Sequence, residues 1–494
     1  YLGAADAHYT PLCPFVIQPR HWVSENVLHS QQDLHRRHAS ARKALGTATH
    51  QIHVGSRGMS GGALLTAGFG VLASVPLVAR TLFPRLTAWI GRSLESFVRP
   101  PKLTHLQLER SAASPGPEPG HVGFSVEEMA GIGERLLRDV GLTSGFARLV
   151  IVLGHGSISL NNPHESAHDC GACGGNVGGP NARALAQILN DPRIREILRS
   201  RGLVIPAETV FVGGLHNTCN EEVTLLDVDF VSPSHWDELA VAQELLEETC
   251  DSNAHERCRR FHSAPLAISP SAARRHVEER SEDLSQVRPE WGHATNAICI
   301  VGRRTRTQGL FLDRRAFLVS YDPLQDDEQG AILARLLGAA FPVCGGINLE
   351  YYFSYTDSTG WGCGTKLPHN ITSLLGVMDG AASDMRTGLP WQMVEIHEPV
   401  RLLFVIETTP ERMLQMMAQN ETIGRLCRNE WVQLAVLDPH SNQIQEFRQD
   451  QFMPYETEVQ ELKKVEKSVD WYRGWRDHLE FAQITPSPLG RGPG

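Results

Sequence analysis

The chain has 494 residues, 41% of them hydrophobic and 21% charged, and is long enough for a large buried core divided into two or three lobes. Its formal net charge of -10 at pH 7 excludes a general nucleic-acid binder and suits a soluble surface. Ten cysteines are too few for a disulfide scaffold. They predict a reducing compartment in which a few thiolates bind metal and the rest pack as small hydrophobic side chains.

The first 110 residues form one predicted region, and its distinctive part is an apolar segment. Residues 1–57 are rich in His and Pro and show little periodicity. Residues 58–79 contain no charged residue, and their length approaches the roughly 20 residues that cross a bilayer. Five glycines and Pro76 argue against a transmembrane helix, and basic residues flank the segment. We therefore expect a buried hairpin or a membrane-surface helix here.

Residues 111–120, rich in Pro, Gly and Ser, predict a linker to a core over residues 121–440. Ser125 followed by two glutamates predicts a helix start, and the apolar run 149–153 predicts a strand buried on both faces. Further predicted strands cover 208–212, 223–228, 297–301, 402–406 and 432–437. Predicted helices cover 181–190, 193–200, 235–250, 327–339 and 409–418. This alternation predicts an α/β fold with a largely parallel sheet and additional helical segments, followed by an extension and tail over 441–494.

The segment that carries chemistry runs from Gly154 to Arg183. His155 stands directly after the buried strand, where α/β folds place ligand sites. Cys170 follows fifteen residues later in a Gly-rich loop, so the pair offers one imidazole nitrogen and one thiolate to a zinc ion. The alternatives are a hydrogen-bonded histidine in a tight turn and a redox or structural pair of Cys170 with Cys173. On these residues alone, the segment predicts a metal site.

Other polar residues are weaker candidates for a role. His216 and Asn217 follow a predicted strand. We expect these two residues either to lie near the metal or to form hydrogen bonds at the base of a loop. The run 303–306, with three arginines, is able to attract an anion, and a solvated basic loop is the favoured interpretation.

A series of long motifs resembles the DabA inorganic carbon transporter subunit family. They occur in the family's order, strongly over residues 120–440 and weakly before. The motifs are GHGSISLNNPHESAHDCGACGG followed by GGPNAR, IPAETVFVGGLHNTC, HVEERSEDLSQVRPEWGHATNA, GLFLDRRAFLVSYDP, GINLEYYFS, GCGTKLPHNITSLLGVMDG and TGLPWQMVEIHEPVRLLFV.

The resemblance implies a fold and a zinc site like those of β-type carbonic anhydrases. In that family a Cys and an Asp of a Cys-x-Asp-x-Arg segment hold zinc together with a later His and Cys, which match His155 and Cys170 here. Cys173 lies outside the pattern. The Cys-x-Asp-x-Arg segment does not occur in this sequence, which we therefore interpret as a carboxy-terminal portion, a fragment with half of the site.

The resemblance also implies an activity and a partner. Zinc lowers the pKa of a bound water to about 7, which permits hydration of CO2 to bicarbonate. We expect that activity of the full-length protein in a complex and not of this chain alone. The implied partner is a membrane-embedded, ion-translocating subunit of the DabB type, similar to the proton-pumping subunits of complex I. The implied location is the cytoplasmic side of the cell inner membrane, as a peripheral protein.

Two alternatives remain. One is a non-catalytic zinc-binding scaffold or docking subunit of a membrane complex. The other is a soluble zinc hydrolase with Asp169 or Glu165 as general base, which the lack of a His-Glu-x-x-His ligand set disfavours.

Overall fold

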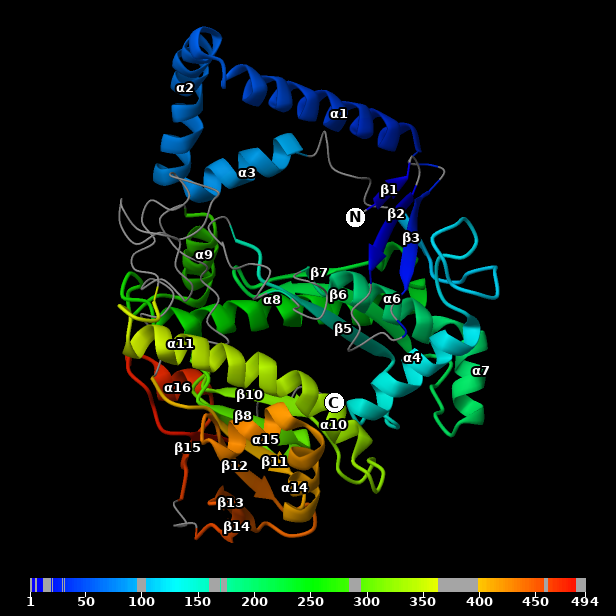
Figure 1. The fold of residues 1–494 in the computed structure, drawn as a ribbon, viewed down its shortest axis with the longest axis vertical. Coiled ribbons are helices and arrows are strands. Elements are labelled where there is room, and N and C mark those ends of the chain that lie inside the picture. The colour runs from blue at the N-terminus through cyan, green and yellow to red at the C-terminus, as the bar shows by residue number, and fades with distance from the viewer. Residues whose placement is uncertain are drawn as a thin grey trace.

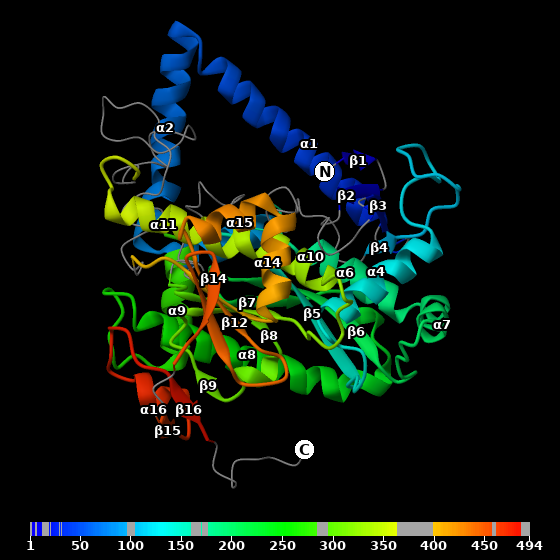
Figure 2. The same ribbon diagram turned by 60° about the horizontal axis from the view of Figure 1, so that its bottom comes forward.

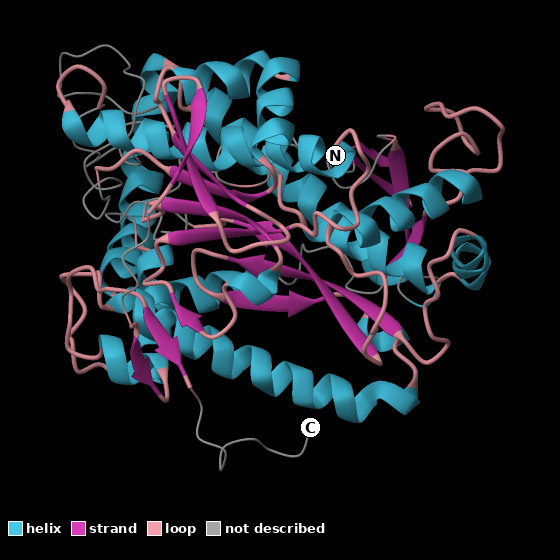
Figure 3. Cartoon of the chain, turned by 90° about the horizontal axis from the view of Figure 1, so that it is seen from below, coloured by secondary structure: helices cyan, strands magenta, loops and turns pink. Residues whose placement is uncertain are grey.

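The computed structural model describes most of the chain. The described residues are 2–4, 7–11, 19, 21–28, 30, 32–95, 104–159, 169, 176–283, 295–362, 399–456 and 461–485. Within them the strands form four sheets, with helices on both sides of the strands (Figures 1 and 3).

The amino-terminal region combines an antiparallel sheet with a helical arm. The sheet has the order β1-β2-β3-β4, with bounds Leu2–Ala4, Ala7–Pro11, Trp22–Val27 and Thr104–Gln107. Between β3 and β4 the chain forms the arm: α1 (Gln32–Gly55), α2 (Met59–Leu82) and α3 (Pro84–Glu95). The corner between α1 and α2 is the part of the arm farthest from the strands in both views (Figures 1 and 2).

The apolar segment 58–79 is therefore part of one continuous helix. The buried hairpin that the sequence suggested is wrong, because α2 shows no reversal and many of its apolar side chains are exposed. Residues 111–120 form a loop whose ends are held together by bonds from the Ser111 and Ala112 amides to the Gly120 carbonyl.

The next unit contains a three-stranded sheet of order β5-β6-β7, with bounds Leu149–Gly156, Val210–Asn217 and Glu222–Leu225. Strands β5 and β6 are parallel, and β7 returns antiparallel to β6. The helices that pack here are α4 (Val126–Asp139), α6 (Gly179–Asn190) and α7 (Pro192–Ser200). Ile132, Leu185 and Leu189 are fully buried in the core that these elements share.

Helix α4 starts where the sequence predicts. Ser125 accepts a hydrogen bond from the Glu128 amide, and the Glu128 carboxylate accepts one from the Ser125 amide, which completes a capping box. In contrast, β5 is only half-buried, and among the described strands it pairs with β6 alone, so its expected burial on both faces is wrong. Leu153 of this edge strand is 39% exposed.

Two further helices, α8 (Trp236–Cys258) and α9 (Pro270–Ser281), pack against each other beside this unit. Their small core contains Cys258, Phe261 and Val277 and extends to Tyr351.

The largest sheet has the order β10-β8-β11-β12-β13-β14. The first four strands are parallel, and β13 and β14 are antiparallel. Their bounds are Ala316–Ser320, Ile298–Gly302, Leu403–Glu407, Gln433–Leu437, Ile444–Arg448 and Gln451–Pro454. The associated helices are α10 (Ala331–Ala340), the π-helical turn Phe341–Gly346, α11 (Ile347–Thr356), α14 (Pro410–Gln419) and α15 (Glu421–Arg428).

Among the described residues, one helix is long and apolar enough to cross a membrane, the continuous run Ala331–Thr356, with 44% of its apolar window buried in the protein. Leu333 and Leu337 are fully buried against the large sheet, as in the core helix of a globular domain.

A small sheet of order β15-β16-β9 completes the fold, with bounds Lys463–Val465, Ala482–Ile484 and Leu310–Phe311. Helix α16 (Ser468–Tyr472) packs against it through Tyr472.

The predicted α/β class is confirmed, and the parallel pairing is confirmed for β5-β6 and for the four strands of the large sheet. The single sheet that the alternation suggested is instead divided, because β5-β6-β7 and the large sheet have separate cores. The finer resemblance to β-carbonic anhydrase remains a prediction.

Candidate metal site at the ends of β5 and β6

His155 lies at the carboxyl end of β5, as the sequence predicts. It is directly opposite His216 of β6, because the two parallel strands pair in register from Leu149↔Val210 to Gly156↔Asn217. Residues paired in this way project to the same face of a sheet, so the two imidazoles share one face at its carboxyl edge. This is the edge at which open α/β sheets place ligands.

A close backbone approach holds His155 against the start of α6. The Gly178 amide donates a 2.7 Å hydrogen bond to the His155 carbonyl. A Cβ atom on Gly154 would lie 2.3 Å from the Gly178 carbonyl oxygen, so only glycine fits at this crossing. Backbone packing thus explains why glycine precedes His155, independently of any chemical role of the histidine.

Cys170 lies outside the described residues, and so does Cys173. The residue before Cys170 is described: Asp169 is buried, and its Oδ1 atom accepts a 2.5 Å hydrogen bond from the Ser157 amide. Asp169, the residue before Cys170, is therefore bonded to a residue two positions from His155. This placement is compatible with a site shared by His155 and Cys170.

The carboxyl ends of the two strands are tied together by Asn217. Its Oδ1 atom accepts hydrogen bonds from the Ile158 amide at 2.9 Å and the Cys219 amide at 3.2 Å, and its Nδ2 atom donates to the Ile158 carbonyl at 3.0 Å. The interpretation of Asn217 as a hydrogen-bonded residue at a loop base is confirmed.

His216 belongs to a charged network that sequence reasoning missed. Its Nε2 atom lies 2.9 Å from Oε2 of Glu221, and the other carboxylate oxygen of Glu221 pairs with Arg257 of α8. Arg257 also donates to the Thr218 carbonyl at 2.9 Å, and both Glu221 and Arg257 are almost fully buried. Arg257 is 36 residues from Glu221 in sequence, so no local signal pairs them.

The electrostatics of this network favour the ionised carboxylate. Burial alone raises the pKa of Glu221, but the charge of Arg257 and the hydrogen bond from His216 outweigh burial and lower it to about 2. Glu221 is thus an anion at neutral pH. By binding one nitrogen of His216, it fixes the orientation of the ring on the face that it shares with His155.

Within the described ranges, which leave out Cys170, no group of three or more His, Cys, Asp or Glu side chains gathers closely enough to hold a metal ion. The described cysteines are buried and unpaired in disulfides, and burial raises the pKa of Cys258 to about 11 and of Cys427 to about 12. These thiols therefore pack as small hydrophobic groups, as the sequence predicts.

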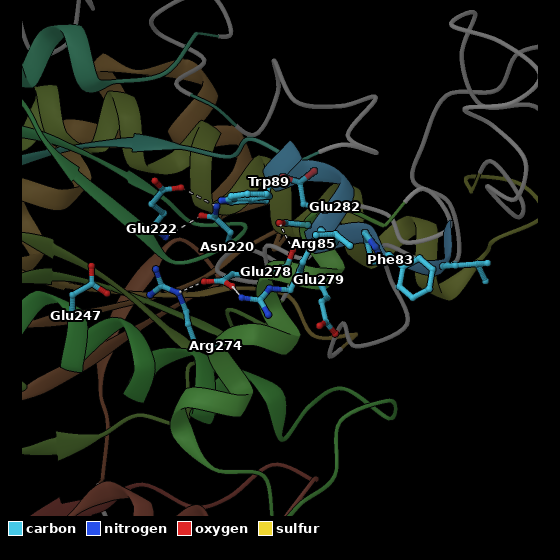
Figure 4. Close-up of a pocket in the computed structure, with 14 residues that line it drawn as sticks. Phe83, Arg85, Trp89, Asn220, Glu222, Glu247, Arg274, Glu278, Glu279 and Glu282 are labelled. Carbon is cyan, nitrogen blue, oxygen red and sulfur yellow. Dashed lines mark hydrogen bonds and ion pairs between the residues drawn. The ribbon is translucent and has the colours of Figure 1, made fainter. Parts of the chain in front are cut away.

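A cavity of about 920 Å³ lies between α3 of the arm and the elements β7, α8 and α9 (Figure 4). Asn220 and Glu222 of the β6–β7 turn border it, and Arg85 of α3 forms a 2.8 Å ion pair with Glu278 of α9. Its lining holds five glutamates and two arginines: Glu222, Glu247, Glu278, Glu279, Glu282, Arg85 and Arg274. This excess of carboxylates disfavours a small anion in the cavity.

Comparison with known proteins decides the family. The model of the family "Probable inorganic carbon transporter subunit DabA" matches residues 1–432. The chain belongs to the DabA family. It is similar to DabA 2 of Rhodopirellula baltica, with 52% identity over 99% of this chain and 45% of the relative, and to DabA 2 of Sorangium cellulosum, with 48% identity over 99% and 48%. DabA of Methylococcus capsulatus is 44% identical over 98% of this chain and 45% of its own length.

The chain thus spans about half the length of these curated relatives. All three carry the description "Probable inorganic carbon transporter subunit". No solved structure matches the chain.

Proposed function

We propose that this DabA-family chain is part of a subunit of an energy-coupled uptake complex for inorganic carbon, in which zinc supports the hydration of CO2 to bicarbonate. Membership of the family supports the transport role, since the relatives are described as inorganic carbon transporter subunits. The observation that carries the site is the position of His155 at the carboxyl end of β5, with Asp169, the neighbour of Cys170, bonded to Ser157.

The residues present fit part of a zinc site. His155 and Cys170 would hold the metal through a nitrogen and a thiolate, which zinc prefers. The described residues provide no third ligand in a cluster, so the remaining ligands belong to the half of the relatives' length that this chain does not span. When bound, zinc would supply a Lewis acid that makes water reactive near neutral pH.

The surrounding residues have separate tasks in this proposal. The Ser157 amide holds Asp169, the residue before Cys170, beside the end of β5, and the Gly178 amide fixes the backbone of His155. His216, oriented by Glu221, presents a polar ring next to His155. The acidic cavity behind the β6–β7 turn disfavours return of bicarbonate on that side.

The proposed partner is a membrane-embedded, ion-translocating subunit of the DabB type, and the proposed location is the cytoplasmic face of the cell inner membrane. The word "subunit" in the relatives' descriptions supports a complex. Coupling to an ion gradient would make hydration effectively one-way and retain bicarbonate in the cell.

Zinc content by elemental analysis tests the proposal. It is measured on this chain and on a chain extended to the length of the relatives, each with His155→Ala, Cys170→Ala and, as a control, His440→Ala in an exposed loop. We expect about one zinc in the extended chain, loss of that zinc in the first two variants, and retention in the control. Stoichiometric zinc in the short chain would instead show that its ligands include residues outside the proposed pair.

A second measurement separates catalysis from a scaffold role, which the half-site favours for this chain alone. The extended chain is assayed for CO2 hydration together with its membrane partner. Zinc-dependent hydration lost in the His155→Ala variant supports the catalytic proposal. Full zinc occupancy without hydration in the assembled complex would favour a non-catalytic zinc-binding scaffold or docking subunit.

A further inference from the structure

Helix α2 presents a row of large aliphatic side chains to solvent. Leu64, Val71, Val75, Val78 and Leu82 are between 53% and 78% exposed. They follow one another at intervals of 7, 4, 3 and 4 residues, so at 3.6 residues per turn they fall within an arc of roughly 60°. We call these five residues the aliphatic stripe.

Small residues flank the stripe and widen the apolar face. Ala63, Ala67, Gly68, Gly70 and Ser74 are all exposed, and no charged residue occurs from Gly58 to Ala79. A water-exposed helix surface normally carries charged side chains, and α2 has none over this length. The exposed face therefore indicates an apolar environment.

The apolar surface continues at the corner between α1 and α2. Met59 is 99% exposed there, and Ile52 and Val54 on the last turn of α1 are exposed as well. This corner is the part of the arm farthest from the strands (Figures 1 and 2). The arm has few contacts with the body, the main ones running from α3 to α9. A helix without tertiary packing is marginal in water, so a surface that receives α2 would stabilise it.

Charge on the arm distinguishes a lipid surface from a protein groove. Helix α1 carries Arg36, Arg37, Arg42 and Lys43 against the single acidic residue Asp33, and Arg57 is exposed at the corner. A basic helix joined to an apolar one suits an anionic bilayer, where the cations meet phosphate headgroups and the apolar face enters the acyl region.

We propose that the α1–α2 corner and the aliphatic stripe of α2 insert into an anionic lipid bilayer. The arm then anchors the chain directly to the membrane, with α1 on the headgroups. This extends the proposed membrane location by naming the surface that makes contact, and it does not depend on the metal chemistry.

The test is co-flotation of the full chain with vesicles of phosphatidylcholine alone or phosphatidylcholine mixed with phosphatidylglycerol. The variant Val71→Glu/Val75→Glu places two charges on the stripe. The matched control, Val241→Glu/Leu245→Glu, places two charges at the same spacing on α8. Val71 and Val75 are 69% and 65% exposed, and Val241 and Leu245 are 56% and 57% exposed, so neither pair disturbs a core.

We expect the wild-type chain and the α8 control to float with the mixed vesicles, and the stripe variant to lose at least tenfold in partitioning. Binding to the mixed vesicles should also exceed binding to phosphatidylcholine alone and should weaken with salt. Absence of flotation for the wild type, or equal loss in both variants, would overturn the proposal.

Two controls distinguish lipid binding from self-association and from loss of the metal. Sedimentation without lipid reports self-association: a wild-type dimer that the stripe variant converts to a monomer, without vesicle binding, would assign the stripe to a second copy and reject the lipid proposal. Zinc content of the extended forms of the same variants reports the metal site separately. If the His155→Ala variant loses zinc but still floats with the vesicles, the result supports membrane binding that is independent of the metal site.

Discussion

Replacement of Glu221 by Gln removes the anion at the centre of the network beside His155. In the folded chain the pKa of Glu221 is lowered from 4.5 to about 2. Burial raises the pKa, but the charges of Arg257 and Arg314 and the hydrogen bonds from His216 and Arg257 together outweigh burial. Each pKa unit corresponds to about 1.4 kcal/mol, so the folded state favours the ionised carboxylate by about 3 kcal/mol relative to the unfolded chain. The side chain is only 2% exposed, so solvent screens little of this energy.

We expect Glu221→Gln to lower the free energy of unfolding by about 3 kcal/mol at pH 7, because Arg257 is left as an uncompensated buried charge. The folded-state pKa lies below the unfolded value, so the stabilisation is fully present above pH 4.5 and is lost as the pH falls from 4.5 to about 2. Urea unfolding followed by circular dichroism, repeated between pH 7 and pH 3, measures both quantities.

The neighbouring substitution Glu222→Gln is the control, since Glu222 is exposed and bonds only the Asn220 amide nitrogen among the contacts described. The double variant Glu221→Gln/Arg257→Met should lose less than the sum of its single variants, because it leaves no buried charge unpaired. Equal stability of the Glu221→Gln and Glu222→Gln variants at pH 7 would refute the reasoning.

Three further substitutions test particular contacts by the same unfolding measurement. Ser125→Ala removes the side-chain half of the capping box at α4 and should cost about 1 kcal/mol; no change would mean that the cap is not stabilising. Gly154→Ala drives a methyl group into the Gly178 carbonyl and should cost about 3 kcal/mol, whereas Gly338→Ala, with open space around it, should be neutral or stabilising. Glu407→Gln should lower the free energy of unfolding above pH 4.5 and lower it less at more acidic pH. The reason is that Arg303 and Arg306 lower the pKa of this buried carboxylate against the effect of burial. A loss of stability that does not depend on pH would contradict that role.

The features that the sequence predicted well are those that depend on residues close together in the chain. The capping box at Ser125 depends on residues three positions apart. The prediction of strand β5, which carries His155 near its end, depends on a single apolar run. In each case the physical cause lies within one turn or one strand, so a single sequence contains it.

The features that the sequence did not predict depend on tertiary contacts. The run 303–306 was interpreted as a solvated basic loop, which is wrong for Arg303 and Arg306, because both form ion pairs with Glu407 of β11, about a hundred residues away. The ion pair of Glu221 with Arg257 could not be predicted from the sequence either, because the two residues are far apart in the chain. Burial is equally non-local: the apolar composition of residues 58–79 left a buried hairpin and a membrane-surface helix both open, and the structure shows that α2 exposes its aliphatic stripe.

Protein contacts hold the strand ends around His155. His155 is fixed through its carbonyl by Gly178, and the β6–β7 turn is fixed by Glu221, which takes a positive φ of 61° and binds both His216 and Arg257. Arg257 in turn connects this turn to α8 through the Thr218 carbonyl. With these contacts already formed, the half-site of the proposed function would need little reorganisation to accept a ligand. A difference in zinc affinity between this chain and an extended chain should therefore report the number of ligands rather than folding of the strands. The circular dichroism of the two His155→Ala variants, expected to match their parents, provides the check.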